Sequence, residues 1–423
     1  MQKSDAQVYL VGGAVRDELM GRAVSDRDFV VVGATTGDMQ AMGYRQVGAD
    51  FPVFLHPVTG EEYALARKEF KNGVGYHGFE VDASADVTLE EDLARRDLTV
   101  NAMARTEDGT LVDPYGGKKD LEDKVFRHVG PNFSEDPVRV LRVARFMARH
   151  AHEGWTVAPE TQDLMTKMCQ SGELESLTPE RVWKELSRAL CEPTPSAFVK
   201  TLKACEGLAA ILPEVDALFG VPQPKVHHPE IDTGIHTMLV MDQSAHLSNR
   251  LEVRFGAMVH DLGKGLTPLE MLPRHIGHEK AGIPLVEALC ERLKAPTSVL
   301  RAGRTASDLH LKVHQAMAMT PKNITEFMTA LRVKTNPALL EDLLLISEAD
   351  ARGRTGKEND RYHQADYLRA MAKKFCQFNA TDVARKFAGN GERISTEIKR
   401  AQTKNLAIEK SRLLAGRESP SPS

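Results

Sequence analysis

The chain has 423 residues, of which 42% are hydrophobic and 27% are charged. This composition is ordinary for a folded protein and excludes a mostly disordered polymer, and the length predicts about two to four domains. The longest apolar stretches, such as residues 343–346, are far shorter than the roughly 20 residues that cross a bilayer, and no signal-peptide pattern precedes the first expected strand. The 5 cysteines form no C-x-x-C pair, which argues against a disulfide framework. We therefore predict a cytoplasmic protein without a membrane segment.

The net charge of −4 is unevenly distributed. Residues 351–423 contain 16 Lys and Arg against 8 Asp and Glu, so a basic C-terminal region follows an acidic body. A basic region of this kind fits either a surface that binds a polyanion or a solvated helical face. The charge pattern alone does not separate these two interpretations.

Strand and helix patterns alternate over the first 130 or so residues, which predicts an α+β head. We expect strands at 8–11, 29–33 and 62–66, and a short helix at 14–20 that Gly21 ends. From Ser134 onward the pattern is helical, with helices expected at 137–148, 159–169, 179–190 and 196–212. A Pro-rich break at 221–229 predicts a boundary.

A Gly-Gly turn stands between the first expected strand and the first helix. Gly12 and Gly13 precede Arg16, and backbone N–H groups at a helix start together with a cation can hold a phosphate. The pattern is neither G-x-G-x-x-G nor a Walker A loop, so dinucleotide and P-loop interpretations do not apply. A lone Gly-Gly turn is usually structural.

Two carboxylates, Asp26 and Asp28, stand just before the second expected strand. Alternate strand residues point to the same face, so both can bind the same metal ions. Mg²⁺ prefers a few carboxylates together with substrate phosphates, and paired metals suit in-line displacement at phosphorus. Together with the Gly-Gly turn, this pair predicts phosphate chemistry.

Two further blocks carry arginines beside acids. Residues 95–102 read R-R-D-L-T-V-N-A, in which Arg96 offers a planar fork to triphosphate oxygens. Residues 135–139 read E-D-P-V-R, and Arg139, Arg142, Arg145 and Arg149 then recur along one side of the next helix. After a carboxylate pair, we interpret this stripe as a nucleotide-binding wall rather than a solvated surface.

In this order, the four blocks resemble the DNA polymerase β-type nucleotidyltransferase superfamily, and within it the class II tRNA nucleotidyltransferases (CCA-adding enzymes) and the bacterial poly(A) polymerases. The resemblance implies catalytic Asp26 and Asp28 that bind Mg²⁺, and an E-D-x-x-R helix that pairs with the incoming base. It implies that ATP and CTP are bound by Gly13, Arg16, Arg96, Asp136, Arg139, Arg142 and Arg145. Glu62 is a candidate third carboxylate, and residues 71–82 resemble a mobile loop near the site.

Histidines concentrate in the second half of the chain. Of 15 in all, nine lie between residues 227 and 314, and residues 259–265 read V-H-D-L-G-K-G. This segment resembles the signature of HD-domain metal-dependent phosphohydrolases. We predict a metal site at His236, His260, Asp261 and His278, with Asp308 and Asp350 as candidate further carboxylates. Imidazole ligands suit Ni²⁺ or another transition metal, which can generate hydroxide to attack a phosphate ester.

The resemblance runs from Gly12 to about residue 380 and implies a polymerase β-type head followed by an all-α neck, an HD domain and a helical tail. We expect the boundaries 1–133, 134–226, 227–334 and 335–423, the last with a disordered end. The implied function is addition of CCA to tRNA 3′ ends from CTP and ATP by a monomer or homodimer. The HD domain would add 2′,3′-cyclic phosphodiesterase, 2′-nucleotidase and phosphatase activities. Two alternatives are a poly(A) polymerase and an HD phosphohydrolase whose head only binds RNA.

Overall fold

The computed structural model describes residues 6–24, 26–47, 53–71, 79–387 and 391–415. Its contacts divide the chain into two compact units. Unit 1 comprises Met1–Glu185 and Ala197–Ile211, and unit 2 comprises Leu186–Ser196 and Leu212–Ser423. Each unit is described by itself below.

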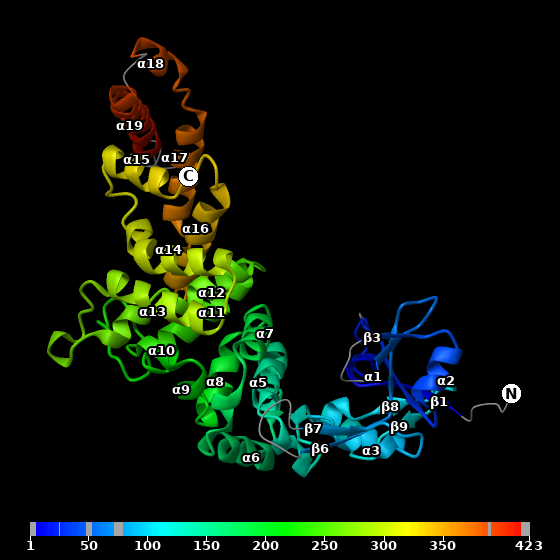
Figure 1. The fold of residues 1–423 in the computed structure, drawn as a ribbon. Helices are drawn as coiled ribbons and strands as arrows, with labels where there is room; N and C mark the ends of the chain where they lie inside the picture. The colour runs from blue at the N-terminus through cyan, green and yellow to red at the C-terminus, as the bar shows by residue number, and fades with distance from the viewer. Residues whose placement is uncertain (1–5, 25, 48–52, 72–78, 388–390, 416–423) are drawn as a thin grey trace, which may run out of the picture. The chain divides into compact units, whose positions relative to one another are not determined.

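Unit 1 begins with a mixed seven-stranded sheet in the order β3-β4-β5-β2-β1-β8-β9 (Figure 1). Strands β1 and β2 pair antiparallel, whereas β2 and β5 pair parallel in a register that places Asp28 beside Glu62. Val11, Val30 and Val31 are buried, as the apolar runs in β1 and β2 require. The mixed sheet with helices confirms the predicted α+β head. Its strands are β1 (Gln7–Val11), β2 (Asp28–Val32), β3 (Arg45–Val47), β4 (Val53–Leu55), β5 (Glu62–Leu65), β8 (Ala104–Arg105) and β9 (Leu111–Val112).

Helices connect the strands of the head and continue beyond it to the end of unit 1. The helix α5 is buried on most of its surface, and α7 runs from unit 1 into unit 2. These helices are α1 (Gly13–Leu19), α2 (Thr36–Ala41), α3 (Leu89–Ala94), α4 (Gly117–Glu122), α5 (Val138–His150), α6 (Pro159–Gln170), α7 (Pro179–Leu190), α8 (Ser196–Ala204) and α9 (Leu208–Ile211), with 3₁₀ turns η2 (Thr99–Asn101), η3 (Pro131–Glu135), η4 (Ala151–Glu153) and η5 (Glu173–Ser176). A two-stranded parallel sheet joins β10 (Val125–Phe126) to β11 (Thr156–Val157).

Two expectations about unit 1 need correction. The helix expected at 196–212 is interrupted between α8 and α9, where Glu206 has a φ of 62° and a Cβ at Gly207 would lie 2.8 Å from Cys169 Sγ. The ends of the loop expected at 71–82 instead form an antiparallel pair, β6 (Lys68–Lys71) with β7 (Phe79–Asp82). Residues 72–78 of that loop lie outside the described residues.

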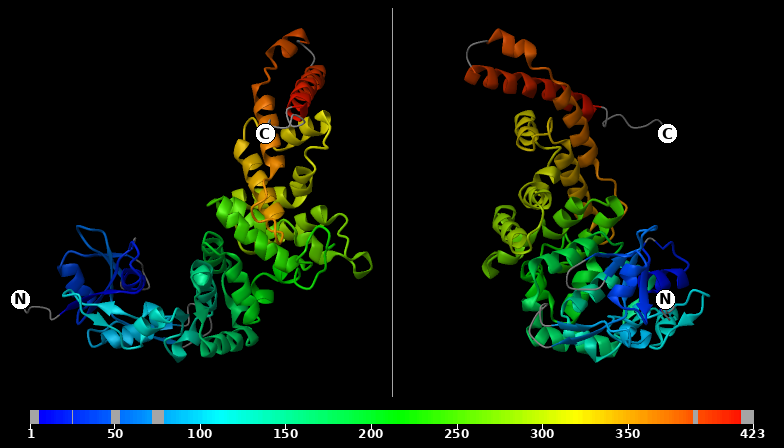
Figure 2. Two further views of the ribbon diagram at one scale, coloured as in Figure 1. Left: turned by 180° about the vertical axis from the view of Figure 1, so that it is seen from behind. Right: turned by 45° about the vertical axis from the view of Figure 1, so that its right-hand side comes forward.

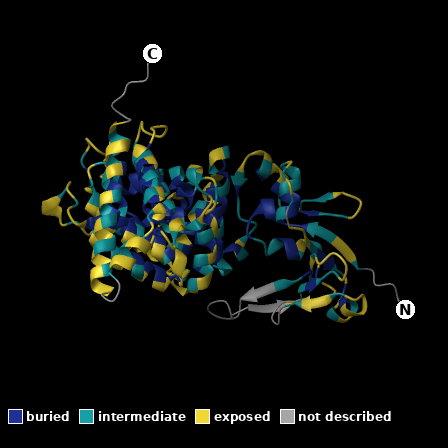
Figure 3. Cartoon of the chain, turned by 90° about the horizontal axis from the view of Figure 1, so that it is seen from above, coloured by how far each residue is buried: buried dark blue, intermediate teal, exposed yellow. Residues whose placement is uncertain are grey.

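The regular secondary structure among the described residues of unit 2 is helical, apart from an isolated β-bridge between Pro222 and Asp232 (Figures 1 and 2). The expected histidine-rich helices are present, and Figure 3 shows buried residues gathered among them with exposed residues on the outer faces. Its helices are α10 (Pro213–Asp216), α11 (Thr233–Leu247), α12 (Leu251–Val259), α13 (His278–Arg292), α14 (Thr297–His314), α15 (Pro321–Ala330), α16 (Pro337–Arg352), α17 (His363–Gln377), α18 (Thr381–Lys386) and α19 (Gly391–Ala415), with the 3₁₀ turns η6 (Leu262–Leu266) and η7 (Leu269–Met271).

No helix among the described residues is both long enough and apolar enough to cross a membrane. The basic C-terminal region forms α17, α18 and α19, in line with the expected helical tail. The expected disordered end falls on residues 416–423, which lie outside the described residues.

Candidate active sites in the head and in the histidine-rich helices

Carboxylates meet at one end of the central head strands. Asp28 begins β2 and is the direct register partner of Glu62 on the parallel strand β5, and Asp26 lies two residues before it. Paired residues on neighbouring strands lie about 5 Å apart with side chains on the same face. Loss of solvent raises the pKa of Asp28 above its ordinary value; Arg96 opposes this shift and Asp26 adds to it. Such a concentration of negative charge favours a bound cation.

The Gly-Gly turn brings Arg96 toward this end of the sheet. Gly12 has a φ of 72°, a conformation that favours glycine, and a Cβ there would lie 2.9 Å from Arg96 Nη1. Arg96 Nη2 is also 3.3 Å from Asp92 Oδ2, which helps to hold the guanidinium. Gly12 therefore leaves the space in which the Arg96 side chain lies against the turn that starts α1.

Hydrogen bonds join the separate sequence blocks into one site. Arg16, which is 4% exposed, donates from Nη1 to Asn101 Oδ1 across 2.7 Å. Asp97 Oδ1 accepts from Asn101, and Asp97 Oδ2 accepts from Arg142 Nε at 2.7 Å. Burial alone would raise the pKa of Asp97, but Arg142 and the bond from Asn101 outweigh it and hold that pKa well below its usual range. The structure thus brings together residues more than 100 positions apart in the chain.

The predicted base-reading pair, Asp136 and Arg139, is held in place by other groups of unit 1. Arg139 donates to the backbone carbonyls of Asn132 and Arg95 at 2.7 Å and 2.6 Å. Asp136 accepts from Arg181 Nη2 on α7 at 2.7 Å, and its other oxygen accepts from the backbone N–H of Val138. Both side chains are therefore oriented before any nucleotide binds, which suits a rigid recognition surface.

The arginine stripe on α5 is less exposed than the sequence pattern suggests. Arg145 is 7% exposed, and its Nε donates to Glu185 of α7 at 2.6 Å. Arg142 is one third exposed and keeps part of its guanidinium accessible beside Asp97. The Phe146 ring lies within 6 Å of the guanidinium carbons of Arg16, Arg142 and Arg145. The role of Arg145 as a nucleotide ligand stays a prediction.

In unit 2, three histidines are oriented in the same way. The Nδ1 atoms of His260, His278 and His310 lie 2.8, 2.6 and 2.9 Å from the backbone carbonyls of Ala257, His275 and Ala306. A carbonyl accepts only, so Nδ1 is the protonated nitrogen in each ring. The opposite nitrogen, Nε2, then carries a lone pair in the neutral ring. This arrangement is typical of metal-binding histidines.

These lone pairs converge with two carboxylates. One group that could hold an ion consists of His236, His260 and Asp350, and a second consists of Asp261, His278 and His310, each with ligand atoms within 4.8 Å of one another. His260 Nε2 is 3.1 Å from Asp261 Oδ2, so the two groups adjoin. A third possible group, His228, Glu230 and His236, shares His236 with the first. The four predicted ligands therefore lie in one cluster.

Of the two candidate late carboxylates, the structure places only Asp350 in this cluster. Asp350 Oδ1 lies 3.1 Å from His236 Nε2, and Asp350 Oδ2 lies 2.6 Å from His314 Nε2. His314 Nδ1 in turn lies 2.7 Å from the hydroxyl of Tyr362, so His314 orients Asp350. Asp308 instead pairs with Lys280, whose side chain is 71% exposed. Asp308 therefore lies outside the cluster.

Burial and charge set the protonation states of the cluster. Burial alone would raise the pKa of Asp261, but His260 and Lys264 outweigh it, and the pKa lies well below the usual range. Burial lowers the pKa of His310 to about 3, so this ring is neutral at pH 7. Burial favours the neutral form of His260, but the negative charge of Asp261 outweighs this effect and raises the pKa of His260. The cluster therefore offers ionised carboxylates together with a neutral imidazole.

A metal ion fits the chemistry of this cluster. His260 Nε2, Asp261 Oδ1 and His278 Nε2 are buried and have no hydrogen bond of normal geometry to any described group, although they lie close together. Buried polar atoms without partners are costly, and they are satisfied when they ligate a cation. Histidine nitrogens with carboxylate oxygens suit a transition metal better than Mg²⁺.

Some residues of these sites escaped prediction. Arg181 orients Asp136 from a helix 45 positions later, and its sequence context is that of an ordinary exposed helix. His310 is one of the nine histidines between residues 227 and 314, but its sequence distance from His260 does not indicate that its side chain faces Asp261. The i, i+4 spacing of His310 and His314 on one helix was the available signal that both face the same side.

Comparisons with known proteins agree with this arrangement. The family described as the Poly A polymerase head domain matches residues 8–127, that described as the probable RNA and SrmB-binding site of polymerase A matches 154–219, and the HD domain matches 233–355. A multifunctional CCA protein of Alkalilimnicola ehrlichii is 56% identical over 363 residues, covering 86% of this chain and 88% of its own.

Solved structures resemble the fold along nearly the whole chain. The Bacillus stearothermophilus CCA-adding enzyme in complex with CTP has a TM-score of 0.62 at 21% identity, covering 96% of this chain and 90% of its own. The Thermotoga maritima CCA-adding enzyme complexed with tRNA has a TM-score of 0.60 at 19% identity, covering 98% and 92%.

The mixed-sheet head with its carboxylates and the histidine-rich helical domain define a nucleotidyltransferase joined to an HD domain. The sequence identity of 56% to a multifunctional CCA protein, over most of the chain, shows which family within this class the chain represents. The chain belongs to the family of multifunctional CCA proteins. This confirms the resemblance, the fold class and the prediction of an enzyme.

Proposed function

We propose that the chain adds C, C and A to tRNA 3′ ends from CTP and ATP without a nucleic-acid template. The observation that carries the proposal is that unit 1 holds three elements of one site. These are the paired carboxylates Asp28 and Glu62, the Gly12 turn against which Arg96 lies, and α5, whose Arg142 bonds to Asp97. Relatives named multifunctional CCA proteins support the same reaction. The predicted cytoplasmic location and the choice between monomer and homodimer stay predictions.

In the head, Asp26 and Asp28 would hold Mg²⁺, which supplies charge neutralisation at the triphosphate and activation of the attacking 3′-hydroxyl. Arg96 and Arg142 would bind the triphosphate oxygens through their planar guanidinium groups. Gly13 and Arg16 would position the nucleotide at the start of α1. Arg145, whose Nε pairs with Glu185, would add positive charge at the nucleotide site.

Base selection would fall to Asp136 and Arg139. A carboxylate accepts hydrogen bonds and a guanidinium donates them, so the pair offers a base edge both kinds of partner. Their fixed positions, set by Arg181 and by backbone carbonyls, allow the pair to reject bases of the wrong pattern.

In unit 2, the cluster around Asp261 would hold Ni²⁺ or another transition metal, which supplies a metal-activated water for phosphate ester hydrolysis. The residues for this role are His236, His260, Asp261, His278, His310 and Asp350. The proposed substrates are 2′,3′-cyclic phosphates, 2′-nucleotides and other phosphomonoesters.

A tRNA that lacks its last three nucleotides tests the main proposal. The full-length enzyme is incubated with this tRNA and CTP, ATP or both, and the products are sized to the nucleotide. Addition of two residues with CTP alone and of three with both nucleotides is the expected result. Tailing of generic RNA with ATP alone would favour the poly(A) polymerase alternative, and no addition at all would favour the phosphohydrolase with an RNA-binding head.

A further inference from the structure

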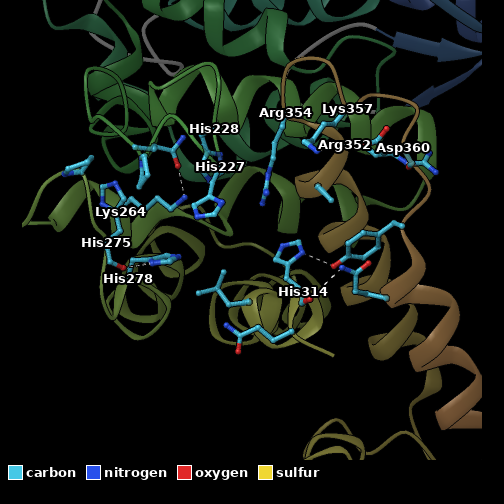
Figure 4. A pocket seen from close by; sticks show the side chains of 18 of the residues that line it. His227, His228, Lys264, His275, His278, His314, Arg352, Arg354, Lys357 and Asp360 are labelled. Atoms are coloured by element: carbon cyan, nitrogen blue, oxygen red, sulfur yellow. Dashed lines mark hydrogen bonds and ion pairs between the residues drawn. The ribbon is translucent and has the colours of Figure 1, made fainter. Parts of the chain in front are cut away.

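A cavity of about 570 Å³ lies within unit 2 beside the histidine cluster (Figure 4). His278 and His314 line it, so it reaches both the second ligand group and the residue that orients Asp350. Its volume is in the range of pockets that hold nucleotide-sized molecules. The cavity therefore has room for a substrate of the cluster, and its walls determine which substrate fits.

The walls are strongly cationic. Lys264, Arg352, Arg354, Lys357 and Arg361 line the cavity, whereas Asp360 is the one carboxylate among the described lining residues. Such walls attract an anion and repel a cation. The lining thus favours anionic ligands, of which a phosphate ester is one.

Most of these cations already have partners. Arg352 pairs with Glu348 at 2.7 Å, Arg361 pairs with Asp366 at 3.0 Å, and Lys264 Nζ lies 2.6 Å from Asp261 Oδ2. Each of these cations is partly neutralised by a neighbouring carboxylate. Their contribution to anion binding is reduced accordingly.

Lys357 pairs only loosely, with its Nζ 3.7 Å from Asp360 Oδ2, and Arg354 is also loosely paired. Arg354 differs from the other cations in its buried N–H, which is unpartnered among the described residues. Its nearest carboxylate oxygen is Asp350 Oδ1, 3.6 Å from Nη2, and its Nε is buried with no hydrogen-bond partner among the described residues. In Figure 4 its side chain extends from the end of α16 into the space near His228 and His314. A buried guanidinium N–H without an acceptor is costly, so a ligand oxygen at this point would be strongly favoured.

The backbone places Arg354 there by a close approach of two helices. A Cβ on Gly353 would lie 2.6 Å from Val240 Cγ2 and 2.8 Å from Val240 Cα. Only a glycine allows the chain after α16 to pass this close to α11. The position of Arg354 is therefore fixed by packing rather than left to a free loop.

A second unsatisfied donor lines the same cavity. Gln223 is 2% exposed; its Oε1 accepts from Lys264 Nζ at 2.6 Å, and its Nε2 is buried without a partner among the described residues. The bond from Lys264 fixes the orientation of the amide, so Nε2 is the group left to donate. Gln223 and Arg354 thus line one cavity, and each has a buried side-chain N–H without a partner among the described residues.

We propose that Arg354 binds the phosphoryl group of the substrate of the HD domain, and that Gln223 donates a second hydrogen bond to the same nucleotide. The ligand class is a phosphorylated 3′-terminal nucleoside, either free or at the end of an RNA. This assignment rests on the proposed hydrolytic function, and it adds specificity residues that lie outside the metal-binding cluster.

The test measures binding separately from hydrolysis. Full-length wild-type, Arg354→Gln and Arg354→Lys proteins are stripped of metal with a chelator and titrated calorimetrically with adenosine 2′,3′-cyclic monophosphate and with inorganic phosphate. Arg354→Gln should weaken nucleotide binding by about ten- to a hundredfold. Arg354→Lys keeps the charge but loses the planar fork, so it should restore only part of the affinity.

Arg369→Gln is the matched control, because it removes one positive charge from α17 at a residue that pairs with Glu341 and does not line the cavity. It should change binding less than twofold. Unchanged CCA addition and unchanged melting would show that each variant is folded. The Gln223→Leu variant should weaken nucleotide binding more than phosphate binding.

Binding that depends on Arg354 supports the assignment even if the wild-type protein hydrolyses no phosphate ester once Ni²⁺ is supplied, in which case only the hydrolytic function fails. Normal nucleotide affinity and normal hydrolysis in both Arg354 variants would overturn the assignment and leave the hydrolytic function standing. Absence of nucleotide and phosphate binding to the wild-type protein would also overturn it.

Discussion

Asp28 and Glu62 occupy paired positions on the parallel strands β2 and β5, so their carboxylates leave the sheet on the same face. The pairing makes Glu62, which is far from Asp28 in sequence, a neighbour of the proposed Mg²⁺ site. Glu61, the residue directly before β5, instead accepts a hydrogen bond from Thr59 Oγ1 at 2.8 Å.

The Asp28→Ala variant should lose nucleotide addition while tRNA affinity changes little, and Asp26→Ala should behave in the same way. Metal-bound carboxylates act on the triphosphate and the 3′-hydroxyl, whereas tRNA is held by many separate phosphate contacts. Single-turnover addition and filter binding measure the two properties on one preparation. Near-normal addition by either variant in Mg²⁺ contradicts the proposal that Asp26 and Asp28 hold the catalytic Mg²⁺.

Glu62→Gln should lower the rate of addition by about tenfold or more, because it removes one negative charge beside Asp28. Glu61→Gln is its control and should leave the rate within about twofold. The comparison is made at saturating CTP so that binding and chemistry are separated. Equal effects of the two substitutions would exclude a specific role for Glu62.

Arg139→Ala should relax the preference for CTP over UTP and for ATP over GTP by about ten- to a hundredfold, since hydrogen bonds to charged groups contribute roughly 1.5–3 kcal/mol. Arg142→Ala should instead weaken the use of CTP and ATP alike. Arg181→Ala should relax the preference by less than Arg139→Ala, because Arg181 acts by orienting Asp136. Incorporation ratios for the four nucleotides provide the measurement, and an unchanged ratio in Arg139→Ala would end the base-reading proposal.

The two sites should fail independently. His260→Ala or Asp261→Asn should remove 2′,3′-cyclic phosphate hydrolysis and leave CCA addition in place, while Asp28→Ala should do the reverse. The ligands of the two sites belong to different units and suit different metals. Both reactions are followed on each variant with Mg²⁺ and Ni²⁺ supplied separately. Parallel loss of both activities in folded His260→Ala protein would contradict the two-site proposal.

Acid should destabilise unit 1 through His150. Burial lowers the pKa of this ring to about 4 from its ordinary 6.5, so the folded state keeps it neutral while the unfolded chain takes up a proton. The stability that the neutral ring contributes is present above pH 6.5 and is lost as the pH falls from 6.5 toward 4. His150→Gln does not titrate there, so its melting temperature should fall less than that of the wild type between pH 6.5 and 5. Parallel curves would show that folding does not lower the pKa of His150.

Periodicity and motif order were enough to predict the central strands and most helices of unit 1. The four candidate HD ligands lie in one cluster, and their role as metal ligands stays a prediction. The helix expected at 196–212 was wrong because the chain breaks at Glu206 and Gly207. Gly207 is a local signal for such a break, and its close approach to Cys169 is the tertiary constraint that the sequence does not show. Asp350 could not be preferred over Asp308 from sequence, since the choice depends on how α16 crosses α11 and α14. Arg181 was missed for the same reason, because its contact is made between helices that are distant in sequence.

The HD cluster takes its proposed ligands from four helices, α11, α13, α14 and α16, and from the segment that follows α12, over residues 236–350. An ion bound there would add a cross-link to the packing and the polar contacts, such as His236 with Asp350, that already join these elements. At a hundredfold excess over its dissociation constant, it would raise the free energy of unfolding by about 2.7 kcal/mol. A chelator should therefore lower the melting temperature of unit 2 while that of unit 1 changes little. Metal supply would then set the heat tolerance of the HD half of the enzyme, and the head would outlast it in warm, metal-poor conditions.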